Sequence, residues 1–314
     1  MPDKVRLVLT TFGDPVNNVV APPSPFDGVG LLLIKTPDGT FGCSGSLLAG
    51  GQDVLTAAHC LTDIYGNLEV NSLTATFFTA AGPRTFNGAN YYVNPDWAGG
   101  NWGDVGVVRL ASETGIPGYD IFRPGDSYGD WVATLAGYGE SGTGGMSAFG
   151  VIGEDPVNYP FGTLRWGLNQ YDAVWTEYDW GPAFAWAYDF DDGTAAHDAL
   201  CLLNVWCDQG TGAWEVMLGA GDSGGPSFIG GKIAGIHSFG ATFGPDYGDI
   251  DWVGDWPLEP NASFGELGGD TIVELYSGWI DQTVAIPEPG SVLLVGLGLL
   301  GMLARVRRRG QQAR

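Results

Sequence analysis

The sequence predicts an all-β protein built as an antiparallel sandwich or barrel, and three observations support this fold class. From residue 29 to residue 284, short apolar runs alternate with turns of Gly, Asp, Asn and Pro. The 52 glycines, roughly 17% of the chain against about 7% on average, follow no Gly-X-Y period and indicate many tight turns. Few windows hold a 3.6-residue apolar period, so long helices are not expected.

The expected strands are short runs rich in β-branched and aromatic residues. They comprise residues 29–35, 46–48, 73–79, 91–93, 105–110, 131–136 and 232–239. Helix is expected only near 57–61 and in a closing segment around 272–283. The stretch 165–192 is dense in Trp, Tyr and Asp, which predicts strands with packed aromatic rings and acidic loops. An aromatic platform for a ligand is the alternative interpretation of this stretch.

The size and charge of the chain exclude some classes of partner. Its 314 residues suffice for two barrels of moderate size. With 13 basic and 36 acidic residues the net charge is −23, which repels nucleic-acid backbones and anionic lipid surfaces. We therefore expect no nucleic-acid partner. Solubility outside the cell is the favoured reason for the acidity, and a preference for cationic substrates is the alternative.

The two ends of the chain differ from its body. Residues 1–25 lack the apolar core of a signal peptide, so either the true start lies upstream or an export signal is missing. At the other end, Pro287-Glu288-Pro289 precedes a charge-free run, 290–304, which a cluster of arginines follows. As a helix this run spans ~22 Å of a ~30 Å hydrocarbon core, and snorkelling arginines extend it. The basic end is expected in the cytoplasm, and the arginines disfavour the alternative of a buried core helix.

A glycine-rich loop around a serine is the most specific motif in the chain. It reads Gly221-Asp222-Ser223-Gly224-Gly225-Pro226. Acyl transfer needs a hydroxyl nucleophile beside backbone N–H groups that point at the developing oxyanion. Because glycine adopts backbone conformations that other residues resist, the N–H groups of Gly221 and Ser223 can converge here.

Two further residues supply the groups that would activate such a hydroxyl. His59 lies among small residues and precedes Cys60, which could anchor its turn. An imidazole is the best general base near neutral pH. Asp104 stands at the start of an apolar strand, where its carboxylate could orient the imidazole and stabilise its protonated form.

Taken together, these motifs resemble the chymotrypsin/trypsin family of serine proteases. The chain order His59, Asp104, Ser223 matches that family, and the resemblance covers about residues 26–283. It implies two antiparallel β-barrels with a catalytic triad in the cleft between them. The expected activity is that of an exported serine endopeptidase, with the N–H groups of Gly221 and Ser223 as the oxyanion hole and no cofactor.

The resemblance also assigns residues to substrate binding. Gly137-Tyr138-Gly139 looks like the family's opening of the second barrel. The run Ser238, Phe239, Gly240 looks like its substrate-binding strand, to which a peptide adds as a further strand. Met217 occupies the position that sets primary specificity, so cleavage after Lys or Arg is not expected, and an uncharged or apolar preference is.

The resemblance further implies a disulfide between Cys43 and Cys60, one of the three pairing schemes that four cysteines allow. Cys201 and Cys207 could form a local bridge. No metal site is expected: zinc at His197 with these two cysteines fits no standard spacing. Four acidic residues could hold calcium, but they lack the ordered ligand spacing of a known loop, and a solvated acidic loop is the favoured interpretation. These residues are Asp246, Asp249, Asp251 and Asp255.

One departure from the family concerns activation. The family matures by exposing an N-terminal Ile or Val whose ammonium pairs with the acid before the nucleophile, here Asp222. No basic residue followed by a branched-apolar pair and glycine occurs near the start of this chain. Another partner is therefore expected to hold Asp222. A catalytically silent protease fold that binds at a surface or matrix, and a serine esterase, remain the alternative functions.

The sequence divides into four expected parts. These are an N-terminal segment at 1–25, a first barrel at 26–130, a second barrel at 131–285 and a tail at 286–314. The tail resembles the PEP-CTERM sorting signal of Gram-negative bacteria, which an exosortase processes. This resemblance implies delivery to the envelope, cell surface or exterior. It also implies membrane contact through the tail before processing, and the expected substrates are proteins or peptides.

Overall fold

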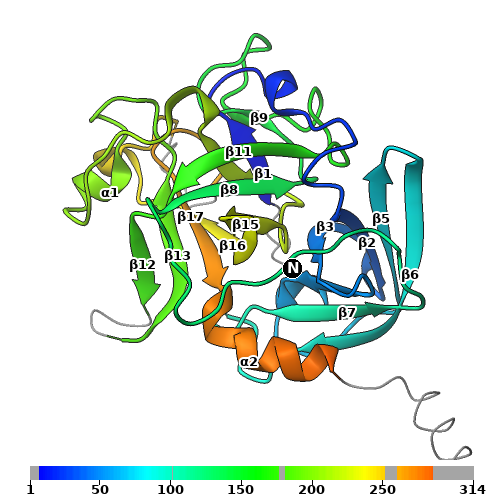
Figure 1. Ribbon diagram of the computed structural model, residues 1–314. Helices are drawn as coiled ribbons and strands as arrows, with labels where there is room; N and C mark the ends of the chain where they lie inside the picture. The colour runs from blue at the N-terminus through cyan, green and yellow to red at the C-terminus, as the bar shows by residue number, and fades with distance from the viewer. Residues whose placement is uncertain (1–6, 101, 177–180, 252–259, 286–314) are drawn as a thin grey trace, which may run out of the picture. The chain divides into compact units, whose positions relative to one another are not determined.

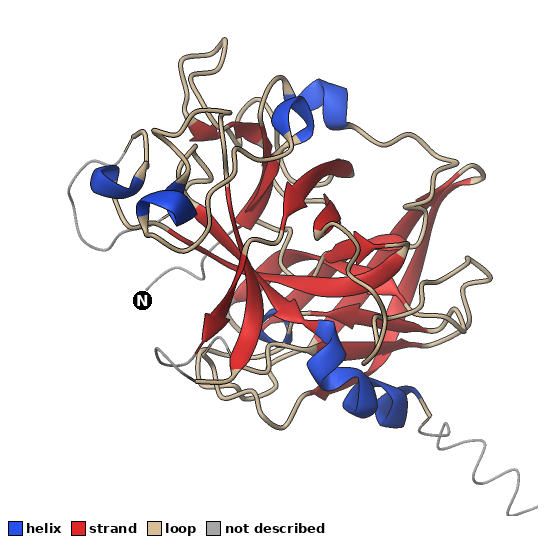
Figure 2. Ribbon diagram, turned by 60° about the vertical axis from the view of Figure 1, so that its left-hand side comes forward, coloured by secondary structure: helices blue, strands red, loops and turns tan. Residues whose placement is uncertain are grey.

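The computed structural model describes residues 7–100, 102–176, 181–251 and 260–285. The chain separates into two compact units, Met1–Gly278 and Trp279–Arg314, and the strands all belong to the first. Strands dominate, and the few helices are short, as Figure 2 shows. The predicted all-β fold class is confirmed.

The first barrel is a closed sheet of six strands in the order β2-β3-β4-β7-β6-β5, drawn in blue and cyan in Figure 1. Its strands are β2 (Val29–Thr36), β3 (Gly39–Leu47), β4 (Asp53–Thr56), β5 (Ser72–Thr79), β6 (Gly82–Val93) and β7 (Gly106–Leu110). In β2 the alternating residues Leu32 and Ile34 are fully buried, while Leu33 is 40% exposed. This two-residue period turns one face of the strand into the barrel core.

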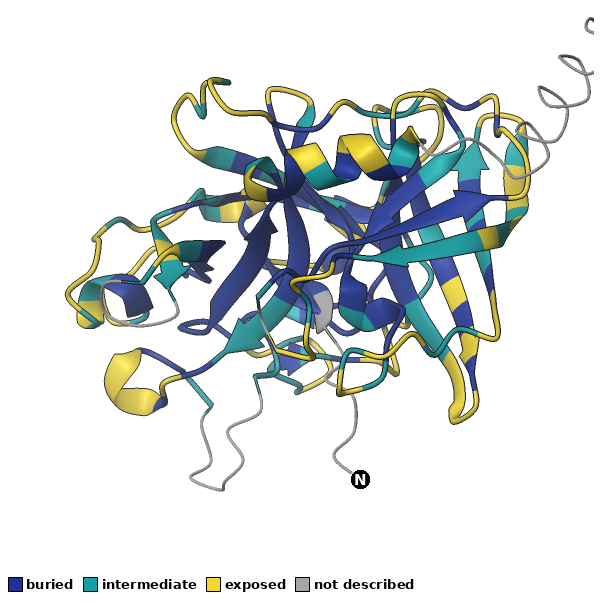
Figure 3. Cartoon of the chain, turned by 90° about the horizontal axis from the view of Figure 1, so that it is seen from below, coloured by how far each residue is buried: buried dark blue, intermediate teal, exposed yellow. Residues whose placement is uncertain are grey.

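The second half of the fold is barrel-like but consists of two sheets. A seven-stranded sheet has the order β11-β8-β15-β16-β17-β13-β12, and a four-stranded sheet has the order β10-β9-β1-β14. Its strands are β1 (Leu7–Thr11), β8 (Val132–Gly137), β9 (Gly142–Thr143), β10 (Gly153–Glu154), β11 (Arg165–Gln170), β12 (Ala173–Thr176), β13 (Ala183–Asp189), β14 (Val216–Gly219), β15 (Pro226–Ile229), β16 (Lys232–Ala241) and β17 (Leu267–Ile272). In this half β14, β15 and β17 are buried along their whole length whereas β12 is not, and Figure 3 shows buried strands in dark blue.

The N-terminal segment contributes a strand to this second half. β1 pairs antiparallel with β14, where Thr10 faces Met217, and parallel with β9. This parallel pair is an exception in sheets whose other named strand pairs are antiparallel among the described residues. Because β14 leads directly into the serine loop, the start of the chain helps to fix the strand from which that loop departs.

The C-terminal helix α2 (Val273–Val284) occupies the expected closing segment. Within the described residues, no helix combines the length and apolar character needed to cross a membrane. The predicted apolar sorting helix at 290–304 lies outside the described residues.

Candidate active site

The fold brings His59 and Asp104 together at one end of the first barrel. Thr56, at the end of β4, pairs with Gly106, at the start of β7. The residues that follow β4 and precede β7 therefore emerge at the same edge. His59 lies in the short helix η2 (Ala58–Cys60), and its Nδ1 is 2.7 Å from Oδ2 of Asp104.

A second hydrogen bond fixes the same pair, because the backbone N–H of His59 donates to Oδ1 of Asp104 at 2.9 Å. The Asp104 side chain is 1% exposed, whereas that of His59 is 29% exposed. A buried carboxylate that accepts the Nδ1 proton fixes the tautomer in which Nε2 is free to act as a base. The ring of Trp97 lies beside His59, with 6.5 Å between ring centroids.

Asp104 also has a partner on the second half of the fold. The hydroxyl of Ser238 donates to Oδ2 of Asp104 at 2.6 Å. Ser238 lies on β16 where the register with β17 shifts between His237 and Phe239. The sequence motif suggested a substrate-binding role for Ser238 but gave no sign of this contact, because the two residues are 134 positions apart.

The first barrel holds the serine loop through β3 and the predicted disulfide. Cys43 on β3 is joined to Cys60, and Sγ of Cys60 lies 3.6 Å from the carbonyl oxygen of Ser223. The N–H of Ser44 donates to that same carbonyl at 2.9 Å. The hydroxyl of Ser44 donates to the carbonyl of Gly221, also at 2.9 Å. The turn that carries His59 is thereby placed against the loop that carries Ser223.

The loop approaches the histidine-bearing segment so closely that it needs glycine at one position. Gly224 has φ +81°, and a Cβ atom there would lie 2.0 Å from Oγ1 of Thr56. Its N–H donates to the carbonyl of His237 at 2.8 Å. A larger residue would push the loop away from β4 and would strain the backbone.

The loop leaves two backbone donors available. The N–H of Asp222 donates to the carbonyl of Gly219, and the N–H of Gly225 donates to the carbonyl of Asp222. Within the described residues, the N–H groups of Gly221 and Ser223 have no acceptor, and neither does the Ser223 hydroxyl. Backbone N–H groups without a protein partner can bind an oxyanion.

Asp222, the residue before Ser223 in the loop, has a fully buried side chain, and the structure shows which groups surround its carboxylate. Its Oδ1 accepts the N–H of Gly139 at 2.9 Å. A Cβ atom at Gly137 would lie 1.9 Å from this oxygen, so the Gly-Tyr-Gly segment makes room for the carboxylate. Burial raises the pKa of Asp222 to about 7, while His237, the Gly139 N–H and the charge of Arg165 act to lower it.

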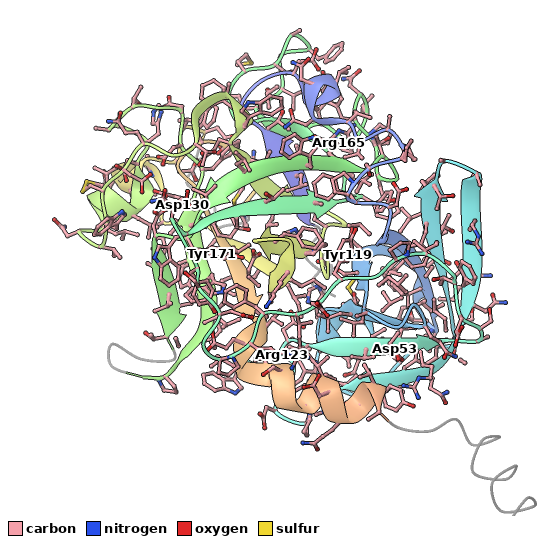
Figure 4. All side chains as sticks on the ribbon, in the orientation of Figure 1. Asp53, Tyr119, Arg123, Asp130, Arg165 and Tyr171 are labelled. Carbon is pink, nitrogen blue, oxygen red and sulfur yellow. A yellow bond between two sulfur atoms is a disulfide. The ribbon has the colours of Figure 1, made fainter. Side chains whose placement is uncertain are left out.

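Arg165 is a buried cation that interacts electrostatically with Asp222. It is 5% exposed at the start of β11, where it pairs with Gly137 of β8, and it is labelled in Figure 4. Its Nε has no hydrogen-bond partner among the described residues. Burial lowers the pKa of Arg165, and the negative charge of Asp222 opposes this effect.

His237 is fully buried next to the serine loop, where its carbonyl accepts the N–H of Gly224. Nδ1 of His237 is 3.0 Å from Oδ1 of Asp270, and both side chains are 0% exposed. The hydroxyl of Tyr171, a residue labelled in Figure 4, donates to Oδ2 of Asp270 at 2.8 Å. Although burial by itself raises the pKa of Asp270, His237 and the hydroxyl donors lower it overall.

The residues predicted to bind substrate fall in different environments. Met217 is 1% exposed and packs in the core of the second half, so its contact with a substrate remains a prediction. Phe239 is half-buried, and its ring lies 5.5 Å from that of Trp175 and 6.2 Å from that of Phe184. Gly240, next along β16, is also half-buried.

The structure removes the zinc alternative at the inserted cysteines. Cys201 and Cys207 form a disulfide, so neither can supply a thiolate ligand. His197 is instead bound to Asp192, with Nδ1 2.6 Å from Oδ2.

The acidic loop is only partly solvated. Asp246 is exposed, whereas Asp249 is 6% exposed and accepts hydrogen bonds from its surroundings. Asp255 lies outside the described residues. The expectation of a wholly solvated loop is therefore wrong at Asp249, which tertiary contacts bury.

Comparisons with known proteins agree with this fold. Residues 19–148 match the family model described as Trypsin, and residues 285–309 match that of the PEP-CTERM protein-sorting motif. Among solved structures, HL collagenase is 20% identical with a TM-score of 0.53, and the likeness covers 87% of this chain and 99% of that one. GrC is 16% identical with a TM-score of 0.55, covering 86% and 98%. No curated protein sequence matches the chain.

The fold is therefore that of the trypsin-like serine proteases. The chain carries a trypsin-family match that includes His59 and Asp104, together with a PEP-CTERM sorting motif, and the predicted resemblance to both is confirmed.

Proposed function

We propose that the protein is an exported serine endopeptidase with His59, Asp104 and Ser223 as its catalytic triad. The observation that carries this proposal is the doubly hydrogen-bonded pair of His59 and Asp104, in a turn that packs against the Ser223 loop. A structural histidine would not need a buried carboxylate on Nδ1 together with a partly exposed ring.

The proposed reaction proceeds through an acyl-enzyme. The hydroxyl oxygen of Ser223 attacks the peptide carbonyl while Nε2 of His59 accepts its proton. The negative charge on the carbonyl oxygen is stabilised by the N–H groups of Gly221 and Ser223. His59 then returns the proton to the leaving amine as the C–N bond breaks. Water repeats the sequence on the acyl-enzyme and releases the acid product.

We further propose that the substrate pairs with the backbone of β16 at Ser238, Phe239 and Gly240. Among the described strands, the pairing of β16 with β15 ends at Ile236, whereas Phe239 and Gly240 pair with β17 alone, which supports a free backbone edge for an added strand. The aromatic neighbours of Phe239, Trp175 and Phe184, favour an uncharged or apolar side chain next to the cleaved bond.

Export and domain limits complete the proposal. The two disulfides favour an oxidising compartment, and the sorting motif at 285–309 favours exosortase processing at the envelope or surface of a Gram-negative bacterium.

The closed barrel β2–β7 supports the limit 26–130 for the first barrel, and 131–285 remains the proposed second barrel. The pairing of β1 with β14 supports a structural role for 1–25.

The test is active-site labelling of the full chain with a fluorophosphonate probe, which reacts only with an activated serine. We expect one label per chain, lost in Ser223→Ala and kept in Ser127→Ala, which alters an exposed serine. Parallel assays of casein digestion and short-chain ester hydrolysis distinguish a protease from an esterase. No labelling of the folded wild type would sink the proposal and favour a silent protease fold.

A further inference from the structure

A cluster of buried carboxylates lies away from the proposed triad, where β13 ends and the helix α1 (Ala199–Leu202) begins. We call Asp189, Asp191 and Asp198 the strand-end acidic cluster. One carboxylate oxygen from each lies within 4.8 Å of those of the other two. Figure 1 shows α1 beyond β12 and β13, on the side of the second half that faces away from the first barrel.

All three side chains are removed from water, at 3%, 2% and 3% exposure for Asp189, Asp191 and Asp198. Leaving a carboxylate buried without a partner costs several kcal/mol. Two of them have one partner each: Leu200 N–H donates to Oδ2 of Asp189, and Cys201 N–H donates to Oδ1 of Asp198. These bonds fix the position of both carboxylates relative to the backbone.

Asp191 has no such partner. Its Oδ1 is fully buried and accepts no hydrogen bond among the described residues. The neighbouring charges that act on it are all negative: Asp189, Glu215, Asp198 and Asp208. Burial, followed by these charges, raises the pKa of Asp191 well above its usual range. A group of buried acids that repel each other is stabilised most directly by a cation.

A second group of neighbouring acids in the same chain is stabilised by hydrogen-bond donors and needs no cation. In Asp249, Asp251 and Glu266 the carboxylate oxygens are equally close to one another. Each of those six oxygens accepts a hydrogen bond from a backbone or side-chain donor. The strand-end acidic cluster lacks these donors, so the proximity of its acids has no explanation within the described protein atoms.

We propose that the strand-end acidic cluster binds one calcium ion, with a carboxylate oxygen from each of Asp189, Asp191 and Asp198 as ligands. Oxygen-only, anionic donor sets suit a hard cation, and Ca²⁺ accepts irregular geometry with water in its remaining positions. The disulfide between Cys201 and Cys207 closes the loop after α1, which limits the movement of Asp198 when the site is empty. The ion would hold the segment around Asp198 and α1 against the end of β13.

The experiment uses the full chain with Ser223→Ala, so that proteolysis cannot affect the result. The protein is freed of metal with a chelator, and Ca²⁺ is added up to about 1 mM, the range of extracellular calcium sites. We expect one Ca²⁺ per chain by equilibrium dialysis and a rise in the thermal midpoint of about 5 °C at saturation. Tb³⁺ should bind competitively and luminesce on excitation of tryptophan, since Trp186 lies on β13.

The variant Asp191→Asn should lose the bound ion and the thermal shift, because it removes the unpartnered ligand while keeping its shape. Should that variant not fold, Asp198→Asn serves the same purpose. Asp251→Asn, in the hydrogen-bonded cluster, is the matched control and should keep both responses. The proposal is overturned if the parent protein binds no Ca²⁺, if Mg²⁺ binds in its place, or if Asp191→Asn responds as strongly as the parent.

Discussion

At the scale of single residues, the proposed base depends on a carboxylate that is held from three directions. Asp104 accepts hydrogen bonds from the backbone and ring of His59 and from the hydroxyl of Ser238. Charge-assisted hydrogen bonds of this kind are short and roughly twice as strong as neutral ones. The orientation of the His59 ring is therefore determined by both halves of the fold.

Substitution of Asp104 should lower turnover more than substitution of its hydrogen-bond partner Ser238. We expect Asp104→Asn to reduce kcat by about 10⁴-fold, because an amide favours the wrong imidazole tautomer. Ser238→Ala should cost about 10-fold, since it removes one of the three bonds and leaves the charge. Turnover of a peptide library by each purified variant measures both effects. Equal losses in the two variants, or no loss in Asp104→Asn, would contradict this role.

Arg165 is expected to act on the loop through Asp222. A buried arginine with an unpartnered Nε is costly for stability, so Arg165→Met should leave the thermal midpoint unchanged or higher. The same change removes a positive charge that favours ionised Asp222 and should lower kcat at least 10-fold.

Comparison of kcat with thermal unfolding separates this role from a purely structural one. Arg165→Lys, which keeps the charge, should recover part of the activity. A loss of stability in Arg165→Met with unchanged kcat would show that the arginine serves folding alone.

At the scale of elements, the link between β3 and η2 joins the histidine turn to the serine loop. The Cys43–Cys60 disulfide closes a loop with a sequence separation of 17. On the chain-entropy account such a loop contributes about 3 kcal/mol to stability.

The double substitution Cys43→Ala with Cys60→Ala should therefore lower the free energy of unfolding by about 3 kcal/mol. It should also lower fluorophosphonate labelling, because Cys60 contacts the carbonyl of Ser223. Urea unfolding and labelling rate measure the two effects. Full labelling at the wild-type rate would show that the disulfide stabilises the barrel without positioning the loop.

At the scale of the whole molecule, buried acids make stability depend on pH. Burial raises the pKa of Asp222 to about 7 from its usual value of 3.8. The folded state therefore binds a proton that the unfolded chain releases between these values. Stability from this group is fully present below about pH 4 and is lost as the pH rises through about 7.

Asp222→Asn should remove this pH dependence in the Ser223→Ala background. The free energy of unfolding of the parent relative to the variant should fall by about 1.4 kcal/mol for each pH unit between about pH 4 and pH 7, and should level off above that. Urea titrations across this range provide the measurement. A constant difference between the two proteins would mean that Arg165 and His237 keep Asp222 ionised throughout.

The all-β fold class and the triad candidates were accessible from the sequence because each depends on local signals, and the family resemblance implied the disulfide from Cys43 to Cys60. Alternating apolar residues define β2, β5 and β16, and the short motifs around His59 and Ser223 are specific in themselves. The strands β4 and β17 were not predicted. In β17 the segment Leu267–Ile272 contains two glycines and an aspartate, and only its central place in the sheet makes it a strand.

Tertiary structure alone decided the contacts that join distant parts of the chain. The sequence determined the candidates for nucleophile, base and acid, because these roles depend on residue type. It could not place Ser238 on Asp104, Arg165 near Asp222, or Asp191 among other acids, because burial and charge–charge distance arise only when separate strands pack. Only the tertiary structure places Met217 in the core of the second half, opposite Thr10 of β1, and its contact with a substrate stays a prediction.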